Sequence, residues 1–331
     1  MYSLTAPSPP PSQVETHAGK TIERLEIHIS SVCGQACVFC SESRRMETFQ
    51  KHPISYESMI KTLIRKRQDG CKHVTFTGGE PTLYPHLPRV LKAAKKLGYR
   101  TYITTDASRL SQKNYASKVI PLLDEICISI HSNKAATHDI LAKTPGSFKR
   151  VLAAFSHIAT ASPQPYLLTN TVLTRFNIDQ ISETVEFLAQ SGIVRHCTIS
   201  NLAPDGAGLK NFEKIACRLR QMTPLTKSLS DISRRTGIVV RFFGTPLCVL
   251  GNDWDLPNDL HWTPRVTVER GMVGGQVGLH EIFSPHPGRM RFYAPKCKNC
   301  SLREKSCFGV FRKYYNLYGE DELKPLQTKN Y

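Results

Sequence analysis

Short apolar runs alternate with longer amphipathic runs between residues 24 and 243. The short runs predict β-strands at Arg24–Ile29, His73–Thr77, Arg100–Thr104, Glu125–Ile130, Tyr166–Leu173, His196–Ser200 and Ile238–Phe243. The longer runs predict helices, because their apolar residues recur every three or four positions. Such alternation is typical of right-handed βαβ units built on a parallel sheet. Six or more of these units form either an open sheet or a closed barrel, and periodicity does not distinguish the two.

This alternation ends after Phe243. Residues 245–331 contain many Pro and Gly residues and predict a hairpin around Glu269–Gly271, without further strand–helix alternation. Residues 1–20 are rich in Pro and Ser, which is typical of a disordered tail. We therefore expect a tail over residues 1–20, a core domain over residues 21–244 and a loop-rich C-terminal domain over residues 245–331.

The composition is that of an ordinary globular protein. Of its 331 residues, 40% are hydrophobic, enough for one large α/β domain with a small appendage or for two modest domains. No apolar run approaches the ~20 residues that span a bilayer. Residues 1–20 lack a basic segment followed by an apolar one, so we expect no signal peptide, no membrane contact and a cytoplasmic location.

The formal net charge is +17. A charge of this size favours an anionic partner such as a phosphorylated small molecule, a nucleotide, RNA or an acidic peptide. A solvated basic surface without such a partner explains the same charge equally well, because charge alone does not define a site.

Cysteines supply the first candidate chemistry. Eleven cysteines in a chain without an export signal favour metal ligation over disulfides. Cys33, Cys37 and Cys40 fall in the loop after the first predicted strand, and such loops hold the sites of parallel α/β proteins. Three thiolates can hold three irons of a [4Fe–4S] cluster and leave the fourth iron open. Zinc would need a fourth ligand, and spacing alone leaves cluster and zinc both open.

The motif Cys33-x-x-x-Cys37-x-x-Cys40, with aromatic Phe39 before its last cysteine, resembles the signature of the radical S-adenosylmethionine (SAM) enzymes. In that family the open iron chelates the amino and carboxylate groups of SAM, and reductive cleavage releases a 5′-deoxyadenosyl radical. The resemblance covers residues 24–243 and implies a partial (β/α)6 barrel of the TIM type. The expected fold class is therefore α/β, with a small loop-rich C-terminal iron–sulfur domain.

The second predicted strand runs into Gly78-Gly79-Glu80, which resembles the GGE motif of the same family. Read alone, this segment is equally typical of a turn. The resemblance implies that the glycine backbone and the Glu80 carboxylate bind the methionine ammonium. The resemblance also implies that Phe39 contacts the cofactor, and that four residues near strand ends do so: Thr105, Ser129, Asn170 and Leu202. Read alone, polar residues at strand ends are equally typical of turns.

Four further cysteines, Cys248, Cys297, Cys300 and Cys307, belong to the C-terminal region. Four thiolates fully ligate one cluster or one zinc, and a CxxC pair in a loop-rich unit favours structural zinc. The family resemblance instead implies a twitch or SPASM-like auxiliary [4Fe–4S] cluster, and the tail has too few cysteines for two. The remaining cysteines are expected to be ordinary core or surface residues: Cys71, Cys127, Cys197 and Cys217.

These features predict a radical SAM enzyme of a biosynthetic pathway that removes hydrogen from a small anionic metabolite. That metabolite would be a nucleotide, a phosphorylated intermediate or a sugar intermediate. The auxiliary cluster would accept an electron or position the substrate, and flavodoxin or ferredoxin would supply the reducing electron. No catalytic side chain and no particular substrate is indicated.

Three alternatives remain. A maturase of a ribosomal peptide would commonly carry a leader-binding domain before the barrel, and only residues 1–23 precede the first predicted strand. An RNA-modifying enzyme is supported by charge alone, so nucleic acid is not the favoured partner. A non-enzymatic protein that binds nucleic acid, with a fold stabilised by bound metal, would not require the Gly78-Gly79-Glu80 motif.

Overall fold

The computed structural model describes residues 22–251, 253 and 255–327, so the expected tail over residues 1–20 lies outside the described residues. The strands are β1 (Arg24–Ser30), β2 (His73–Gly78), β3 (Arg100–Thr105), β4 (Glu125–Ser129), β5 (Tyr166–Val172), β6 (Val194–Ser200), β7 (Val239–Phe243), β8 (Arg265–Val273), β9 (Gln276–Ser284), β10 (Arg291–Phe292) and β11 (Val310–Phe311). The α-helices are α1 (Ser43–Phe49), α2 (Tyr56–Gln68), α3 (Leu87–Lys96), α4 (Lys113–Val119), α5 (Ala135–Ala142), α6 (Ser147–Ala159), α7 (Ile181–Gln190), α8 (Gly206–Ile215), α9 (Thr223–Thr236), α10 (Leu247–Leu250) and α11 (Arg312–Tyr318). Within these residues, no helix is both long and apolar enough to cross a membrane.

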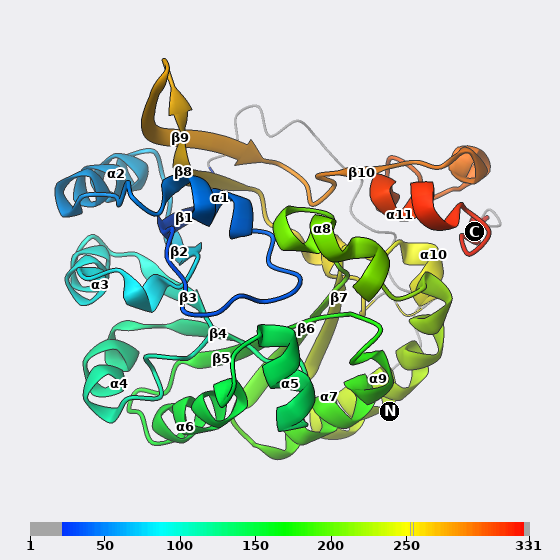
Figure 1. Ribbon diagram of the computed structural model, residues 1–331, viewed down its shortest axis with the longest axis horizontal. Helices are drawn as coiled ribbons and strands as arrows, with labels where there is room; N and C mark the ends of the chain where they lie inside the picture. Colours follow the sequence, from blue (N-terminus) through cyan, green and yellow to red (C-terminus); the bar gives the residue numbers. More distant parts are fainter. Residues whose placement is uncertain (1–21, 252, 254, 328–331) are drawn as a thin grey trace.

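Nine strands of the described chain form one sheet in the order β7-β6-β5-β4-β3-β2-β1-β8-β9. All neighbouring pairs are parallel except β8 and β9. The sheet curves, and helices α2, α3, α4, α6, α7 and α9 follow its outer side (Figure 1). This confirms the predicted partial barrel with a small C-terminal region. The barrel is open, because β7 and β9 are separate edges of the sheet.

Side-chain alternation along β1 separates the two sides of the sheet. Leu25 and Ile27 are almost fully buried and belong to one apolar cluster with Leu63 of α2. Glu26 and His28 point to the opposite, concave side, where ion pairs hold them. Each fully buried Leu or Ile stabilises the fold by about 1.5–3 kcal/mol, so the contact between sheet and helices holds the barrel together.

The C-terminal segment returns to this sheet. Arg24–Ile27 of β1 pair in parallel with Arg265–Val268 of β8, so the sheet continues past the expected domain boundary at residue 244. The predicted hairpin exists, but Glu269–Gly271 lie inside β8 and the turn lies at Gly274 and Gly275. The predicted turn position was wrong because the two-residue turn needs positive φ, and these glycines adopt +58° and +81°.

A buried ion pair joins two segments of the loop-rich region. Arg291 of β10 donates to the Asp259 carboxylate at 2.6 Å, and both side chains are only 1% exposed. Arg291 also donates to the backbone carbonyl of Pro287 and lies against the rings of Phe308 and Phe311. Because charges buried this deeply are costly unless paired, each partner depends on the other.

We expect Arg291→Met to lower the free energy of unfolding by about 3–5 kcal/mol, because it leaves the Asp259 carboxylate buried without a counter-charge. Urea unfolding measures the change. Arg289→Met is the matched control, because Arg289 is exposed and forms no ion pair within the described residues. Equal unfolding midpoints for the two variants would contradict the structural role of the pair.

Candidate active site at the carboxyl edge of the sheet

Cys33, Cys37 and Cys40 lie on the loop between β1 and α1, at the carboxyl end of the strand. All three are free thiols of intermediate exposure. They line one pocket of about 330 Å³, whose other walls include Met46 of α1 and Lys210 of α8. The structure therefore brings the three predicted metal ligands together around one opening.

The surroundings of these thiols determine what they can bind. Burial raises the pKa of Cys33 to about 12, and the nearby Asp106 and Glu80 carboxyl groups add to the rise. Burial also raises the pKa of Cys37, as does negative charge on Cys40 and Cys33. Three thiolates here would repel one another unless a positive centre joined them. By its chemistry this donor set fits an iron–sulfur cluster, whose binding would release protons.

Neighbouring helices hold the loop through backbone contacts. The Val38 N–H donates to Leu141 at the end of α5, and the Ala207 N–H donates to the Cys40 carbonyl at 2.9 Å. Gly206, at the start of α8, has a φ of +53°. A Cβ atom there would lie 2.5 Å from the Cys40 carbonyl oxygen and 2.7 Å from that of Ser41. Only glycine allows α8 to approach the third cysteine this closely.

Gly78 and Gly79 join the end of β2 to the beginning of the same loop. The Gly79 N–H donates to the Ser30 carbonyl and the Glu80 N–H donates to the Val32 carbonyl, both at 2.7 Å. A Cβ atom on Gly78 would lie 2.4 Å from the Ser30 oxygen, and one on Gly79 would lie 2.5 Å from the Val32 oxygen. Both glycines are therefore required by the contact with the cysteine loop.

The Glu80 side chain is 1% exposed. Its carboxylate accepts hydrogen bonds from the Thr82 N–H (2.9 Å) and hydroxyl, the Thr105 hydroxyl (2.7 Å) and the Asp106 N–H (2.7 Å). Burial and the nearby Asp106 charge raise the pKa of Glu80. Asp106 in turn lies 3.9 Å from the Cys33 sulfur. Among the described residues, no Lys, Arg or His forms an ion pair with either acid, so a cationic ligand group would be stabilised here.

The other predicted cofactor residues lie at different depths. Thr105 contacts Glu80, and Ser129 pairs with Asn170 at the same edge of the sheet. The Ser200 hydroxyl donates to the Asn170 side chain at 2.7 Å. Leu202 is 1% exposed, and its side chain belongs to the apolar core.

Phe39 points into the protein. It is buried and meets the ring of His131 edge-on, with the ring centroids 4.6 Å apart. The sequence-based set omitted Asp106 and Gln35, although Asp106 directly follows Thr105 and Gln35 lies between two of the cysteines. A polar residue within two positions of a predicted ligand was the local signal for each of them.

An ion-pair network joins the segment after the cysteine loop to the C-terminal hairpin. Glu42 accepts from His28 at 3.0 Å and from Arg45 at 2.9 Å, and Arg45 also donates to Glu269 of β8 at 2.5 Å. Burial lowers the pKa of His28, but hydrogen bonds with Glu26 and Glu42 outweigh it and raise the pKa to about 10. The imidazole is therefore positively charged at neutral pH and serves as a cation of the network.

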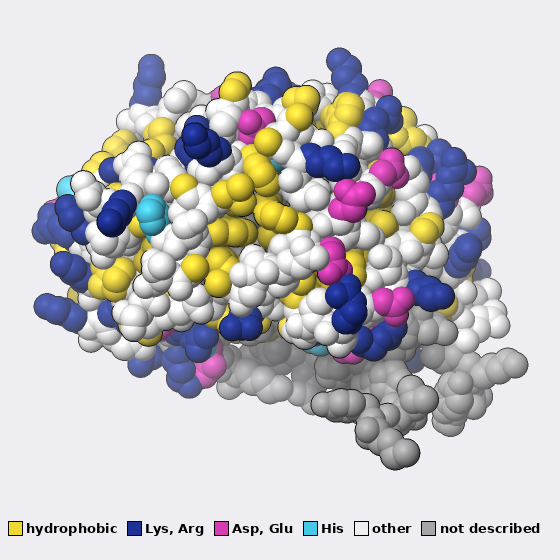
Figure 2. Space-filling view, turned by 90° about the horizontal axis from the view of Figure 1, so that it is seen from below, with side chains coloured by type: hydrophobic (Ala, Val, Ile, Leu, Met, Phe, Trp, Pro, Cys, Tyr) yellow, Lys and Arg dark blue, Asp and Glu magenta, His cyan; other side chains and the backbone are white. Residues whose placement is uncertain are grey.

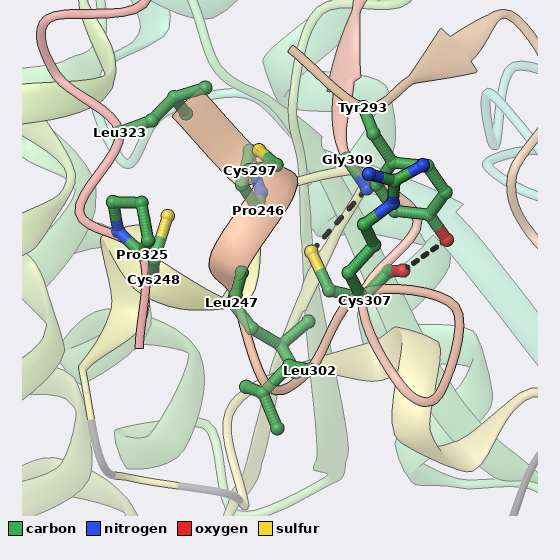
Figure 3. A pocket seen from close by; sticks show the side chains of 12 residues that line it. Pro246, Leu247, Cys248, Tyr293, Cys297, Leu302, Cys307, Gly309, Leu323 and Pro325 are labelled. Atoms are coloured by element: carbon green, nitrogen blue, oxygen red, sulfur yellow. Dashed lines mark hydrogen bonds between the residues drawn. The ribbon is translucent and has the colours of Figure 1, made fainter. Parts of the chain in front are cut away.

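The second cysteine group encloses a separate cavity beside α10. Cys248, Cys297, Cys300 and Cys307 all line it, with mostly apolar neighbours that include Leu247, Leu302 and Leu323 (Figure 3). Burial raises the pKa of Cys248 to about 12. The four thiols supply a complete set of soft ligands, which fits a cluster or zinc by its chemistry. Among the described residues, no three His, Cys, Asp or Glu side chains are grouped closely enough to hold a single metal ion.

The four remaining cysteines, Cys71, Cys127, Cys197 and Cys217, are buried core residues, as expected. Lys and Arg side chains on the face seen in Figure 2 form several separate groups around a central hydrophobic area, with Asp and Glu side chains among them. On that face the positive charge forms no continuous basic surface.

A family model described as the Radical SAM superfamily matches residues 27–188. The chain belongs to the radical SAM superfamily. The match includes the three cysteines and the Gly78-Gly79-Glu80 segment. This family implies a [4Fe–4S] cluster and SAM as cofactors, and the chain is accordingly a radical SAM enzyme.

Curated relatives agree with this assignment. A "Probable GTP 3′,8-cyclase" of Metallosphaera sedula is 27% identical over 303 residues, covering 88% of this chain and 84% of the relative. A protein of the same name from Saccharolobus islandicus is 29% identical over 314 residues, covering 93% and 92%. An "S-adenosylmethionine-dependent nucleotide dehydratase" of Flammeovirga pacifica is 28% identical over 164 residues, covering 48% of this chain and 56% of the relative.

Solved structures share the fold. SuiB of Streptococcus suis bound to S-adenosylmethionine has a TM-score of 0.61 at 18% identity. The alignment covers 92% of this radical SAM chain and 76% of the SuiB chain. The enzyme anSMEcpe with bound AdoMet and a peptide has a TM-score of 0.53 at 16% identity. The alignment covers 66% of this chain and 63% of the anSMEcpe chain. At such identities the likeness concerns the fold alone.

We expect Gly206→Ala to reduce the iron bound by the cysteine loop, because the added methyl group would displace the Cys40 and Ser41 carbonyls. Iron analysis after anaerobic reconstitution measures the effect. Gly192→Ala is the matched control: Gly192 also has positive φ, +69°, but a Cβ atom there meets nothing within 4 Å. Both variants carry backbone strain of about 1–3 kcal/mol, so equal iron content would show that the close approach of α8 is unimportant.

Proposed function

We propose that this enzyme cleaves SAM reductively to a 5′-deoxyadenosyl radical, which removes a hydrogen atom from a nucleotide or a related small anionic metabolite. One observation carries the proposal. Three thiols on one loop lie next to two buried carboxyl groups, Glu80 and Asp106, that have no cation of their own among the described residues. A ligand that combines a metal-chelating group with a positive charge suits this arrangement.

In this proposal Cys33, Cys37 and Cys40 hold a [4Fe–4S] cluster, which supplies the electron and an open iron for SAM. The Glu80–Asp106 pair stabilises the cationic end of SAM, because a positive charge offsets the two neighbouring carboxylates. Gly78 and Gly79 allow the end of β2 to approach the cysteine loop closely, which places Glu80 beside the thiols. Glu80 also fixes Thr105 and the Asp106 N–H through its hydrogen bonds.

The remaining strand-end residues orient the rest of the cofactor. Ser129 and Asn170 offer polar side chains at one edge, and the hydrogen bond from Ser200 fixes the Asn170 amide. The Leu202 backbone is assigned to the adenine, whereas Phe39 supports the loop from behind through its contact with His131. In this division of roles no side chain acts as a proton donor or acceptor in the reaction.

A nucleotide is the favoured substrate class. The relatives that cover most of the chain are named for a GTP cyclisation, and a relative over the first half is named for a nucleotide dehydration. The net charge of +17 favours an anionic substrate in the same way. Flavodoxin or ferredoxin is the proposed electron donor.

Cys248, Cys297, Cys300 and Cys307 are proposed to hold a second [4Fe–4S] cluster. The mostly apolar walls of the cavity that they line limit the access of water to such a group, and Arg303 is the charged residue in its lining. Its role would be to accept an electron from the substrate or to position it. The domain assignment, a core over residues 21–244 and a C-terminal cluster region over residues 245–331, remains part of this proposal.

Metal analysis tests the number of clusters. We expect about eight irons per chain after anaerobic reconstitution, from two four-iron clusters. Replacing Cys33, Cys37 and Cys40 by Ala should remove about four irons, and Cys297→Ala/Cys300→Ala should remove the other four. A triple variant that retains all its iron would refute the loop assignment. Wild-type protein with about four irons and one zinc would refute the second cluster and favour a structural metal.

SAM binding tests the acidic pair. We expect Glu80→Gln to weaken SAM binding about ten- to a hundredfold with the cluster still assembled, because a charge-assisted contact worth roughly 1.5–3 kcal/mol is lost. Equilibrium binding to the reconstituted protein measures this, and thermal unfolding checks the fold. Glu47→Gln is the control, since Glu47 lines the same pocket but its side chain is 64% exposed. Unchanged affinity for SAM in Glu80→Gln would remove Glu80 from the site.

A further inference from the structure

A chain of buried polar side chains lies behind the cysteine loop. The Gln35 amide lies between two groups: its Nε2 is 2.7 Å from the Ser147 hydroxyl, and its Oε1 is 3.3 Å from the Cys37 sulfur. Ser147, at the start of α6, also meets Nε2 of His138 at 3.1 Å. Gln35 is 9% exposed, His138 1% and Ser147 not at all, so water does not compete for these contacts.

The hydrogen bonds at the His138 end of these linked side chains have a fixed direction. The backbone N–H of His131 donates to Nδ1 of His138 at 3.1 Å, so Nδ1 carries no proton. Burial lowers the pKa of His138 to about 4, and the ring is neutral at physiological pH. The single ring proton is therefore on Nε2, which donates to the Ser147 oxygen. Ser147 keeps its own hydroxyl proton for another acceptor.

The direction of the hydrogen bonds at the Gln35 end depends on whether Cys37 is a thiol or a thiolate. As a thiol, Cys37 donates its proton to Oε1 of Gln35, and the amide Nε2 donates to Ser147. A ligating thiolate has no proton and repels Oε1. A half-turn of the amide then exchanges its two ends: Nε2 donates to the Cys37 sulfur, and Oε1 accepts the hydroxyl proton of Ser147. In this second arrangement every donor in the chain points toward Cys37.

We propose that His138, Ser147 and Gln35 form a relay of hydrogen-bond donors that stabilises negative charge on Cys37 and raises the reduction potential of the cluster bound there. The inference rests on the proposed function, because it requires Cys37 to be a cluster ligand. Hydrogen bonds to ligand sulfurs favour the reduced cluster, which carries one more negative charge. Donors linked in series polarise one another and strengthen the last bond.

Gln35 also serves the first cysteine. Its backbone N–H donates to the Cys33 sulfur at 3.4 Å, so in the second arrangement one residue supplies donors to two of the three cysteine sulfurs. The side-chain relay can be removed by substitution while this backbone bond stays. The contribution of the amide can therefore be measured separately.

The test is an EPR-monitored redox titration of the reconstituted full-length protein without SAM, in the Cys297→Ala/Cys300→Ala background, where only the loop cluster is reducible. In Gln35→Leu we expect the ratio of reduced to oxidised cluster at a fixed potential to fall about tenfold, which is a midpoint lowered by ~59 mV for a one-electron couple. Ser147→Ala should shift the midpoint in the same direction by a smaller factor. Gln68→Leu is the matched control, because Gln68 is exposed on α2.

Each outcome decides the inference. Midpoints equal to that of Gln68→Leu, with full iron content in Gln35→Leu and Ser147→Ala, would overturn the relay. If Gln35→Leu loses its iron, the midpoint of Ser147→Ala decides alone. Loss of the cluster from both variants would show that these side chains only hold the loop in place, and would overturn the effect on potential. Absence of any cluster signal in the parent would refute the proposed function itself, and the relay with it.

Discussion

Two backbone hydrogen bonds at the carboxyl ends of β1 and β2 determine the geometry of the whole site. They run from the Gly79 and Glu80 N–H groups to the Ser30 and Val32 carbonyls, and they require backbones so close that no side chain fits between them. This contact holds the beginning of the cysteine loop against the acidic turn. Cys33 then lies beside Asp106, and Glu80 is turned inward to the end of β3.

The two cysteine groups occupy contrasting environments. The loop after β1 borders two buried carboxyl groups and a polar chain that ends at His138, whereas the tail cavity has mostly apolar walls. Net charge, hydrogen bonds to sulfur and solvent access together set the potential of an iron–sulfur cluster. Two clusters in these two settings would therefore differ in potential even though their ligands are all cysteines.

Local sequence signals predicted much of this structure. The seven strands of the core were predicted with ends within two residues of those observed, because each is a short run between turn signals. The cysteine and glycine motifs were visible because their residues are adjacent in sequence. The pairing of β8 with β1 had no such signal, since both strands are ordinary locally. The contact between Gln35 and Ser147 spans 112 residues, and only the fold brings the two together.

The hairpin at the open edge of the barrel has a consequence for how the molecule forms. Glu26 meets Arg265 across 239 residues, and Arg45 meets Glu269 across 224. In a growing chain β1 and α1 emerge early, but both lack these partners until β8 emerges. Contacts so distant in sequence close a large loop and form late in folding. The ion pairs that join β1 and α1 to β8 therefore form later than the contacts of the cysteine loop with β2, α5 and α8, so the cysteine ligands are in place before the hairpin closes over that side of the sheet.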